Sequence, residues 1–370
     1  MRPLDGCLVV DFSTLLPGPL ATLILAEAGA EVVKVERPGG DELRSWDPQW
    51  GAQSVDFALL NRGKKSIVLD LKDAAQRPTL DRLLARADVL VEQFRPGVMA
   101  RLGLDYAHVA ASNPRLVYCS ITGYGQTGPK RDVAAHDVNY MAESGLLSLS
   151  MGPVSHPVLP PALIADVAGG SYPTVMNILL ALRERERTGK GRHLDVSMSD
   201  NLFTLAYWAL GRGFATGAWP GNGNDLVTGG SPRYQLYPTR DGRMLAVGAI
   251  EQRFWDTFCD LVGLEPSLRD DSKDAAATIA RVREIIARET AGTWAHRITG
   301  CDCCCSVVST IEEASRDAHF IARGLFQYRL AGEDGRSIPA LHVPIDRAFR
   351  GDSNVALVAP RLEAADSGNL

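Results

Sequence analysis

Apolar runs alternate with amphipathic stretches through the N-terminal half of the chain. Residues 7–12 form a short apolar run, residues 20–28 carry apolar side chains at helical spacing, and residues 31–36 form a second apolar run. The pattern predicts a strand, a helix and a second strand. Strands joined by a helix lie parallel with a right-handed crossover, so the recurrence of this alternation predicts a doubly wound α/β sheet. The further expected strands cover 66–71, 88–92, 116–122 and 193–197, and the further expected helices cover 73–86, 172–187 and 199–216.

A stretch rich in glycine and proline, residues 217–232, interrupts this pattern. Such a composition is typical of a linker or a loop. The segment 233–325 then carries short strands and helices in a different arrangement, which predicts a smaller α+β domain. We therefore expect a large domain over residues 1–216, completed by about 326–370 after the smaller domain.

Composition limits the partners that the chain can have. Its 370 residues carry 39 lysines and arginines against 44 acidic residues, a net charge of −5, which argues against nucleic acid as the main partner. No apolar run reaches the length of about 18 residues that a membrane span needs. The first residues also lack the apolar core of a secretory signal. We expect no membrane span and a cytoplasmic location.

Four of the seven cysteines fall within residues 301–305. An odd number of cysteines in a cytosolic chain predicts free thiols. No second pair of ligands stands at the spacing of a zinc site, and adjacent side chains in an extended segment point to opposite faces. We therefore expect small apolar filler here, and no metal site.

A glycine-rich loop follows the strand expected at 116–122. Gly123, Gly125 and Gly128 fit the spacing GxGxxG of dinucleotide-binding turns. Pro129 follows directly, where a long helix should begin, and the loop follows a late strand of the chain rather than the first. The sequence therefore favours an irregular loop whose backbone passes close to a ligand over a dinucleotide site.

Three titratable groups follow this loop. The adjacent pair His136 and Asp137 lies at an expected loop-to-helix junction, and Asp166 precedes Gly169 and Gly170. A histidine can be merely structural, and an aspartate before a helix can be an N-cap. An imidazole and a carboxylate among apolar residues and glycines also suit acid–base chemistry on a bound carbon acid. The two glycines would let a ligand approach the helix closely.

Basic residues gather near the ends of expected strands in the first half of the chain. Arg37, Lys65 and Arg95 are examples. Scattered surface cations are the plain explanation. In a chain of net negative charge, however, cations at one edge of a sheet also indicate a ligand that carries phosphate.

Taken together, these segments resemble the class III CoA-transferase family, and within it the α-methylacyl-CoA racemase branch. The racemase branch carries a histidine before the shared aspartate, as His136 does before Asp137, and a Val-Gly-Ala-Ile-Glu segment, matched by 247–251. Departures are Ala135, where the branch has glycine, and the cysteine-rich segment 303–305. The segments that carry the family resemblance are 35–40, 61–66, 94–98, 123–125 and 188–191, and residues 135–140 and 229–234 also resemble the racemase branch.

The resemblance implies a fold and an activity. The fold is a Rossmann-like large domain made from both chain ends, plus a small domain, in an interlocked homodimer. The activity is racemisation of the α-carbon of 2-methylacyl-CoA thioesters, with CoA as part of the substrate and no cofactor required. His136 and Asp166 would be the two bases, with Glu251 paired to His136 and a backbone N–H near Asp137 holding the enolate oxygen. The residues expected to hold CoA are Arg37, Lys65, Arg95, Gly125 and Tyr140.

Two alternatives remain open from the sequence. In CoA transfer between carboxylic acids, Asp166 would attack the acyl carbonyl and then carry CoA as a thioester, which leaves His136 and Glu251 without a role. In an inactive acyl-CoA-binding scaffold, none of the three would react. The sequence favours racemisation because a histidine beside the aspartate serves proton transfer.

Overall fold

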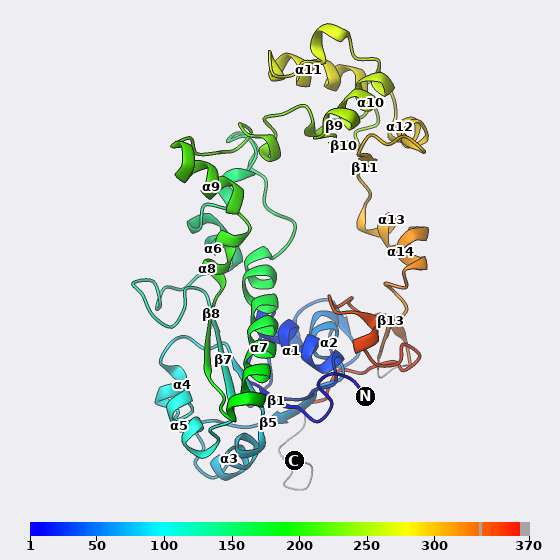
Figure 1. The fold of residues 1–370 in the computed structure, drawn as a ribbon. Coiled ribbons are helices and arrows are strands. Elements are labelled where there is room, and N and C mark those ends of the chain that lie inside the picture. Colours follow the sequence, from blue (N-terminus) through cyan, green and yellow to red (C-terminus); the bar gives the residue numbers. More distant parts are fainter. Residues whose placement is uncertain (333–334, 363–370) are drawn as a thin grey trace. The chain divides into compact units, whose positions relative to one another are not determined.

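A parallel sheet of six strands organises the computed structural model, which describes residues 1–332 and 335–362. Counted along the chain, the order of these strands is 3-2-1-4-5-6, an order found in doubly wound α/β sheets. The expectation of a parallel α/β sheet is confirmed. Across the sheet the strands are β5 (Lys65–Val68), β2 (Glu31–Glu36), β1 (Leu8–Asp11), β6 (Val89–Glu92), β7 (Val117–Thr122) and β8 (His193–Ser197) (Figure 1).

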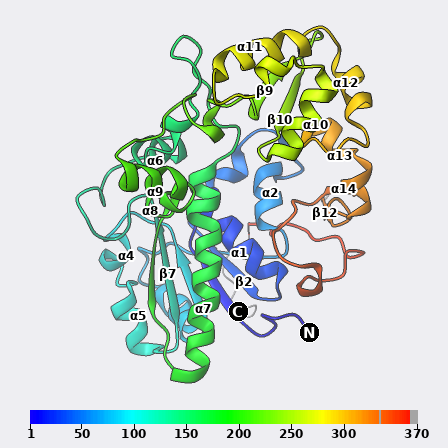
Figure 2. The same ribbon diagram turned by 45° about the horizontal axis from the view of Figure 1, so that its top comes forward.

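Helices cover both faces of this sheet. α1 (Pro17–Glu27) and α7 (Tyr172–Thr188) pack against each other, and α7 also contacts β7 (Figure 2). The opposite face carries α3 (Arg77–Arg86), whose leucines repeat at helical spacing and enter one core with Val10, Leu90 and Tyr118. α4 (Val98–Arg101) and α5 (Tyr106–Ser112) contribute Met99 and Val109 to the same core. Burial on both faces explains why the strands read as nearly continuous apolar runs.

Chain contacts divide the protein into two compact units. The first contains residues 1–144, 162–205 and the described residues from 318 onward, and the second contains 145–161 and 206–317. The second unit is built on a three-stranded antiparallel sheet, whose core includes Trp255 and Trp294. Its elements are β9 (Tyr234–Pro238), β10 (Met244–Gly248), β11 (Cys305–Val307), α10 (Gln252–Val262), α11 (Ala275–Ile286) and α12 (Ala291–Ile298).

These units differ from the expected boundaries at three places, one of which is the segment 318–325, expected in the smaller domain but part of the first unit. The helix expected over 199–216 is broken into α8 (Met198–Asn201), a 3₁₀ turn and α9 (Tyr207–Thr216), and α9 belongs to the second unit. The segment 145–161, expected in the large domain, also groups with the second unit. The physical reason is a small apolar cluster in which Leu149 packs with Ala206 and Ala209. The boundary therefore lies before the glycine-rich stretch 217–232.

Both ends of the chain contribute to the first unit. The Gly63 N–H donates to the carbonyl of Val358 at 2.8 Å, and Arg62 donates to the carbonyl of Leu341 at 2.7 Å. Leu330 packs in one apolar cluster with Ala58. Within the described ranges, no helix has both the length and the apolar character that crossing a bilayer requires. The remaining helices and strands are β3 (Gln49–Trp50), β4 (Gln53–Ser54), α2 (Val55–Asn61), α6 (Asp137–Glu143), α13 (Ile311–Ser315), α14 (Ala318–Ala322), β12 (Arg329–Ala331) and β13 (Ser337–Pro339).

Candidate active site

A cavity of about 380 Å³ lies in the first unit, where β6 and β7 end. Its walls come from the loop 93–96 after β6 and from residues 121–124 at the end of β7. His136 and Asp166, thirty positions apart in the sequence, both line it. In this sheet the order of the strands along the chain changes direction between β1 and β6, and ligands bind at the carboxyl ends of strands near such a point.

The backbone around His136 is fixed by a reciprocal pair of hydrogen bonds. His136 adopts an extended conformation directly before α6, and its N–H donates to Oδ1 of Asn139 at 3.0 Å. The Asn139 N–H donates back to the His136 carbonyl at 2.8 Å. Such a capping arrangement orients the residue that enters the helix. The imidazole itself remains exposed at the cavity.

Asp166 lies in the first turn of a π-helical segment, Ala165–Ser171. It is therefore inside the helix and is not its N-cap, a position that Ile164 occupies. Burial and, to a lesser extent, the negative charge of Asp137 raise the pKa of Asp166 to about 6, while His136 acts in the opposite direction. A carboxyl group with such a pKa can act as an acid or as a base near neutral pH. π-Helical turns are rare and occur often at functional sites.

Asp137 supports Asp166 directly. Its carboxylate is buried, with 6% exposure, and Oδ1 accepts the N–H of Asp166 at 2.9 Å. The bond connects the start of α6, next to His136, with the π-helical turn. Asp137 thus sets both the backbone position of Asp166 and part of the electrostatic environment of its carboxyl group.

Gly169 and Gly170 serve protein packing rather than the approach of a ligand. A Cβ atom on Gly169 would lie 2.3 Å from the carbonyl oxygen of Met198, and one on Gly170 would meet Met198 and Pro17 at 3.1 Å. The Asn201 side chain also donates to the Gly169 carbonyl at 2.7 Å. The expectation that a ligand lies against these glycines is wrong, because α8 occupies that space.

The loop after β7 wraps around Tyr140. A Cβ atom on Gly123 would lie 2.4 Å from the Tyr140 ring, and the Tyr140 hydroxyl donates to the Ala135 carbonyl at 2.8 Å. Gly125 has a φ of +82°, a conformation that suits glycine. The cavity wall contains Gly123 and Tyr140 but does not contain Gly125. Tyr140 therefore reaches this cavity, whereas the role of Gly125 in CoA binding stays a prediction.

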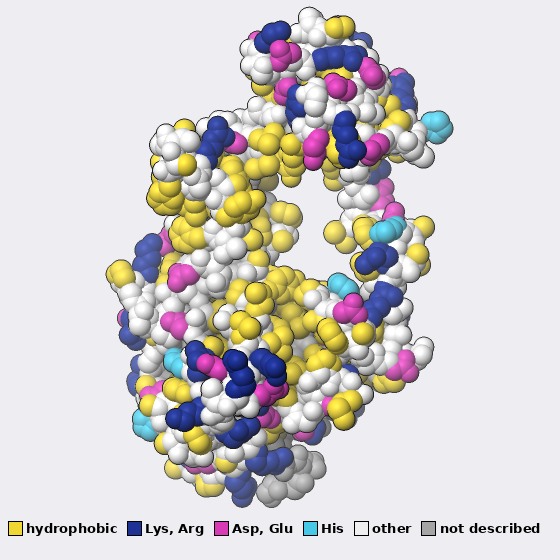
Figure 3. All heavy atoms as spheres, in the orientation of Figure 1, with side chains coloured by type: hydrophobic (Ala, Val, Ile, Leu, Met, Phe, Trp, Pro, Cys, Tyr) yellow, Lys and Arg dark blue, Asp and Glu magenta, His cyan; other side chains and the backbone are white. Residues whose placement is uncertain are grey.

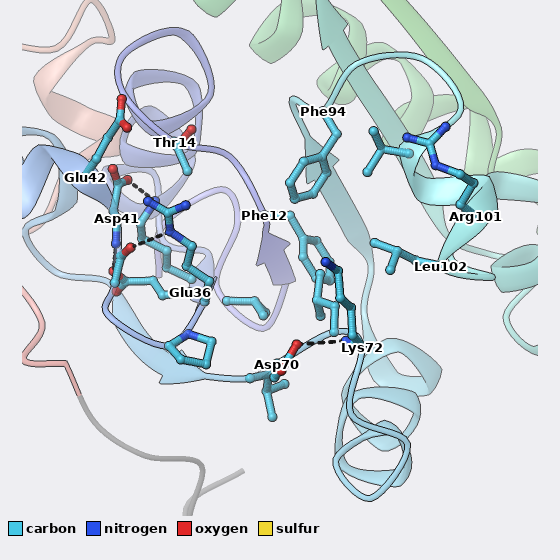
Figure 4. A pocket seen from close by; sticks show the side chains of 18 residues that line it. Phe12, Thr14, Glu36, Asp41, Glu42, Asp70, Lys72, Phe94, Arg101 and Leu102 are labelled. Atoms are coloured by element: carbon cyan, nitrogen blue, oxygen red, sulfur yellow. Dashed lines mark hydrogen bonds and ion pairs between the residues drawn. The ribbon is translucent and has the colours of Figure 1, made fainter.

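A larger cavity of about 980 Å³ adjoins the first, and Phe94 lines both. Its cationic lining groups are Lys34, Arg37, Lys72 and Arg101. Lys34 is paired with Asp41, whereas Arg37 follows β2, Lys72 follows β5 and Arg101 lies on α4. Figure 4 shows Arg101 and Leu102 on one side of this cavity and Glu36 and Asp41 on the other. The apolar part of the wall includes Phe12, Leu69, Leu71, Phe94 and Leu102. Such a site suits a flat apolar ring that carries anionic groups.

Two predicted residues lie elsewhere. Lys65 begins β5 and forms an exposed ion pair with Glu31 at 2.5 Å, at the amino-terminal edge of the sheet. Lys72, which follows the same strand, reaches the cavity instead. The rule that ligands bind at the carboxyl ends of parallel strands could have selected Lys72 from the sequence. Glu251 belongs to the second unit, where it precedes α10, and its pairing with His136 remains a prediction.

The cysteine-rich segment has no metal-binding geometry. Within the described part of the chain, no group of three or more His, Cys, Asp or Glu side chains is arranged to hold a metal ion. Cys303 is buried in the core of the second unit, while Cys301 and Cys304 are exposed. These thiols are free.

Comparison with known proteins gives a consistent assignment at the level of the family. The model of the CoA-transferase family III matches residues 4–365. α-Methylacyl-CoA racemase of Homo sapiens is 37% identical over 330 residues, which cover 87% of this chain and 82% of that protein. Succinate–glutarate CoA-transferase of Agrobacterium fabrum is 36% identical over 365 residues, which cover 93% of this chain and 89% of that protein. A crystal structure of a CAIB/BAIF family protein from Brucella suis has a TM-score of 0.81 and 28% identity, and covers 98% of this chain and 96% of its own.

Proposed function

Because the chain belongs to the CoA-transferase family III, we propose that it acts on acyl-CoA thioesters and that its reaction is racemisation of the α-carbon of 2-methylacyl-CoA. Racemase and transferase relatives are similar to it to nearly the same degree, so the choice depends on the site. The observation that carries the proposal is that His136 and Asp166 line one cavity. Proton transfer at a carbon needs two such groups, whereas CoA transfer needs only the carboxylate.

The proposed mechanism moves one proton off the α-carbon and another onto it. The thioester α-C–H is a weak acid, so its ionisation needs a base close to the carbon and stabilisation of the enolate oxygen. In one direction the Asp166 carboxylate removes the proton, the C–H electron pair moves into the enolate, and protonated His136 donates a proton to the opposite face. In the other direction the two groups exchange roles. Because the pKa of Asp166 is about 6, its protonated form at pH 7 costs only about 1.4 kcal/mol.

The enolate oxygen needs a hydrogen-bond donor near the carbon. The helix α6 begins at Asp137, and the first N–H groups of a helix have no partner within that helix. The N–H of Asp137 is our candidate donor, because it follows His136 directly in the chain. Partial positive charge at a helix start also favours a developing anion.

The larger cavity is the proposed site of the nucleotide end of CoA. Its apolar wall suits the adenine ring, and Arg37, Lys72 and Arg101 suit the phosphates. Phe94 and Arg95 follow β6, and Arg95 lines the smaller cavity. The pantetheine arm would then pass Phe94 to bring the thioester carbonyl between His136 and Asp166.

A second copy of the chain is the proposed partner. On α7, Met176, Leu179 and Leu180 are 63%, 44% and 67% exposed, although Ile178 on the same helix is fully buried. Figure 3 shows hydrophobic side chains gathered over the first turns of this helix. A helix that is apolar on two sides is expected to be covered on both. Light scattering coupled to size-exclusion chromatography should give twice the mass of one chain, and Leu180→Lys should lower it.

The alternative reaction is CoA transfer. A half-buried carboxylate beside the cavity, as in Asp166, is also what a transferase nucleophile requires, and the transferase of Agrobacterium fabrum is 36% identical. Asp166 would attack the acyl carbonyl and expel CoA as a thiolate, which would then attack the Asp166 carbonyl of the anhydride, releasing the donor carboxylate and leaving an aspartyl-CoA thioester. An acceptor carboxylate would expel CoA from that thioester to form a second anhydride, and CoA would attack its acyl carbonyl, giving the new acyl-CoA and free Asp166. In that reaction His136 would have no chemical step.

One experiment separates these reactions. The protein is incubated with (2R)-2-methylacyl-CoA in deuterium oxide without any free carboxylic acid. Loss of optical purity together with deuterium at the α-carbon supports racemisation. Reaction only after a free carboxylic acid is added would establish transfer, and absence of both reactions would leave an acyl-CoA-binding scaffold.

A further inference from the structure

A row of polar side chains crosses three neighbouring strands near their carboxyl ends. Glu92 on β6 is paired in register with Ser120 on β7, and Ser120 with Asp195 on β8. Paired positions on adjacent parallel strands direct side chains to the same face of the sheet. Glu92 and Ser120 are 3% and 1% exposed, respectively, while Asp195 lies on the edge strand and is exposed. The reaction proposed above uses none of these three residues.

Each carboxylate in this row holds a loop that forms the catalytic cavity. Oε2 of Glu92 accepts the N–H of Phe94 at 2.8 Å. Both carboxylate oxygens of Asp195 accept the N–H of Gln126, at 3.1 and 3.0 Å. Phe94 lines both cavities, and the loop of Gln126 also carries Gly123, which lines the smaller one. The polar row therefore fixes the two loops between which the thioester would lie.

Burial of the Glu92 carboxylate is unfavourable for the stability of the fold. Burial of a carboxylate without a cationic partner costs free energy. Among the residues that the structure describes, no ion pair joins Glu92 to a lysine or arginine. The pKa of Glu92 is raised to about 7, mainly by burial and slightly by the charge of Asp195, while the hydrogen bonds from Ser120 and Phe94 lower it. An apolar side chain would avoid the cost of burying a carboxylate, but it could not accept the N–H of Phe94.

We propose that Glu92 is a positioning residue for the CoA thioester: its ionised carboxylate holds the backbone at Phe94, and protonation of that carboxylate weakens the hold and lowers the affinity for the ligand. The inference rests on the proposed function for the identity of the ligand, a CoA thioester, but does not depend on which reaction the ligand undergoes. Hydrogen bonds to an ionised acceptor are roughly twice as strong as neutral ones. The Phe94 ring and the Arg95 side chain follow the same backbone.

The direction of the pH effect follows from the surroundings of Glu92. Because its pKa is raised to about 7, Glu92 is mainly protonated at pH 6 and mainly ionised at pH 8. Affinity should therefore fall as the pH falls through this range. His193 stands 3.0 Å from the Ser120 hydroxyl, and burial lowers its pKa, with Asp195 and Asp105 acting in the opposite direction. A small cavity of about 110 Å³ lies beside Glu92, and its other titratable or charged lining groups are Arg95, Asp105, Tyr106, Tyr118 and His193. Asp195 also acts on Glu92 through its charge.

Binding of an S-alkyl-CoA thioether, which carries no thioester to react, tests the proposal by calorimetry at pH 6, 7 and 8. The wild-type protein should bind about fivefold more weakly at pH 6 than at pH 8, the loss expected for a charge-assisted hydrogen bond that becomes neutral. Glu92→Gln should bind equally at all three pH values, with the affinity of the wild type at pH 6. The matched control is Glu186→Gln, an exposed residue of α7 paired with Arg183, which should keep the wild-type pH dependence.

Two further variants should shift the midpoint of the pH dependence in opposite directions, which a packing defect would not do. Ser120→Ala removes a group that lowers the pKa of Glu92, so the midpoint of the pH dependence should rise. Asp195→Asn removes a charge that raises it, so the midpoint should fall. An affinity that is independent of pH, or a pH dependence that survives Glu92→Gln, overturns the inference even if the protein racemises its substrate. Binding with the expected pH dependence but no racemisation overturns the proposed function and leaves the inference intact, and absence of any binding overturns both.

Discussion

The buried carboxylate of Asp137 accepts the backbone N–H of Asp166 at 2.9 Å, across 29 positions of sequence. The contact links the residue after one proposed base to the other proposed base. The negative charge of Asp137 also contributes to the raised pKa of Asp166. Asp137 is therefore a positioning residue with two separable effects, one on geometry and one on charge.

Replacement of Asp137 by asparagine should separate these effects. Asparagine keeps an acceptor oxygen for the Asp166 N–H but removes the negative charge that raises the pKa of Asp166, so that pKa should fall below about 6. For the enantiomer whose proton Asp166 removes, kcat/KM falls as the pH decreases through this pKa. The acidic limb of that profile should move to lower pH in Asp137→Asn. An unmoved limb would contradict the electrostatic role, and Asp137→Ala should lower kcat further because the acceptor is lost as well.

His136→Ala and Asp166→Asn should each lower the rate of racemisation by about 10²- to 10⁴-fold, the usual contribution of a general acid or base. Their effects on deuterium exchange should differ by enantiomer, because each variant retains one base on one face of the carbon. His136→Ala should still exchange the α-proton of the enantiomer whose α-proton faces Asp166. Asp166→Asn should still exchange the α-proton of the other enantiomer. The measurement is mass spectrometry of each enantiomer in deuterium oxide. Equal loss of exchange from both enantiomers in both variants would argue against two bases on opposite faces.

Arg101→Ala should raise KM for the CoA thioester by about tenfold or more, since a hydrogen bond between charged groups contributes about 1.5–3 kcal/mol. The same variant should act on the corresponding pantetheine thioester, which lacks the nucleotide, with an unchanged KM. Arg101 lines the larger cavity, away from His136 and Asp166. Lys65→Ala is the matched comparison, because it removes a cation at the opposite edge of the sheet. If Lys65→Ala raises KM as much as Arg101→Ala does, the nucleotide does not occupy the larger cavity.

Gly123→Ala should destabilise the protein by about 1–3 kcal/mol, as overpacking generally does. Its Cβ atom would lie 2.4 Å from the Tyr140 ring, so the ring or the loop must move, and the cavity wall with it. Gly211→Ala on α9 is the control, because nothing lies within 4 Å of the added atom and alanine favours a helix. Chemical denaturation gives both free energies of unfolding. A Gly123→Ala variant as stable as the control would show that the loop adapts freely.

Much of the fold was open to prediction because secondary structure follows local patterns. The apolar runs at 31–36 and 116–122 are strands within a residue or so of their expected ends. The prediction of one helix over 199–216 was wrong, because the spacing of apolar residues does not reveal the break between α8 and α9. The domain boundary moved for a related reason: Leu149 packs with Ala206 and Ala209, and a contact between distant residues leaves no local signal.

The sequence by itself determined the family, the parallel α/β architecture and the pairing of a histidine with an aspartate as candidates for proton transfer. These features depend on residue identity, spacing and short-range periodicity, which a single chain displays openly. The tertiary structure alone decided that Asp137 supports Asp166, that Gly169 makes room for α8, and that Lys72 rather than Lys65 reaches a cavity. It also revealed the row from Glu92 to Asp195. Such relationships arise from the order and register of strands, which are set by contacts between residues far apart in the chain.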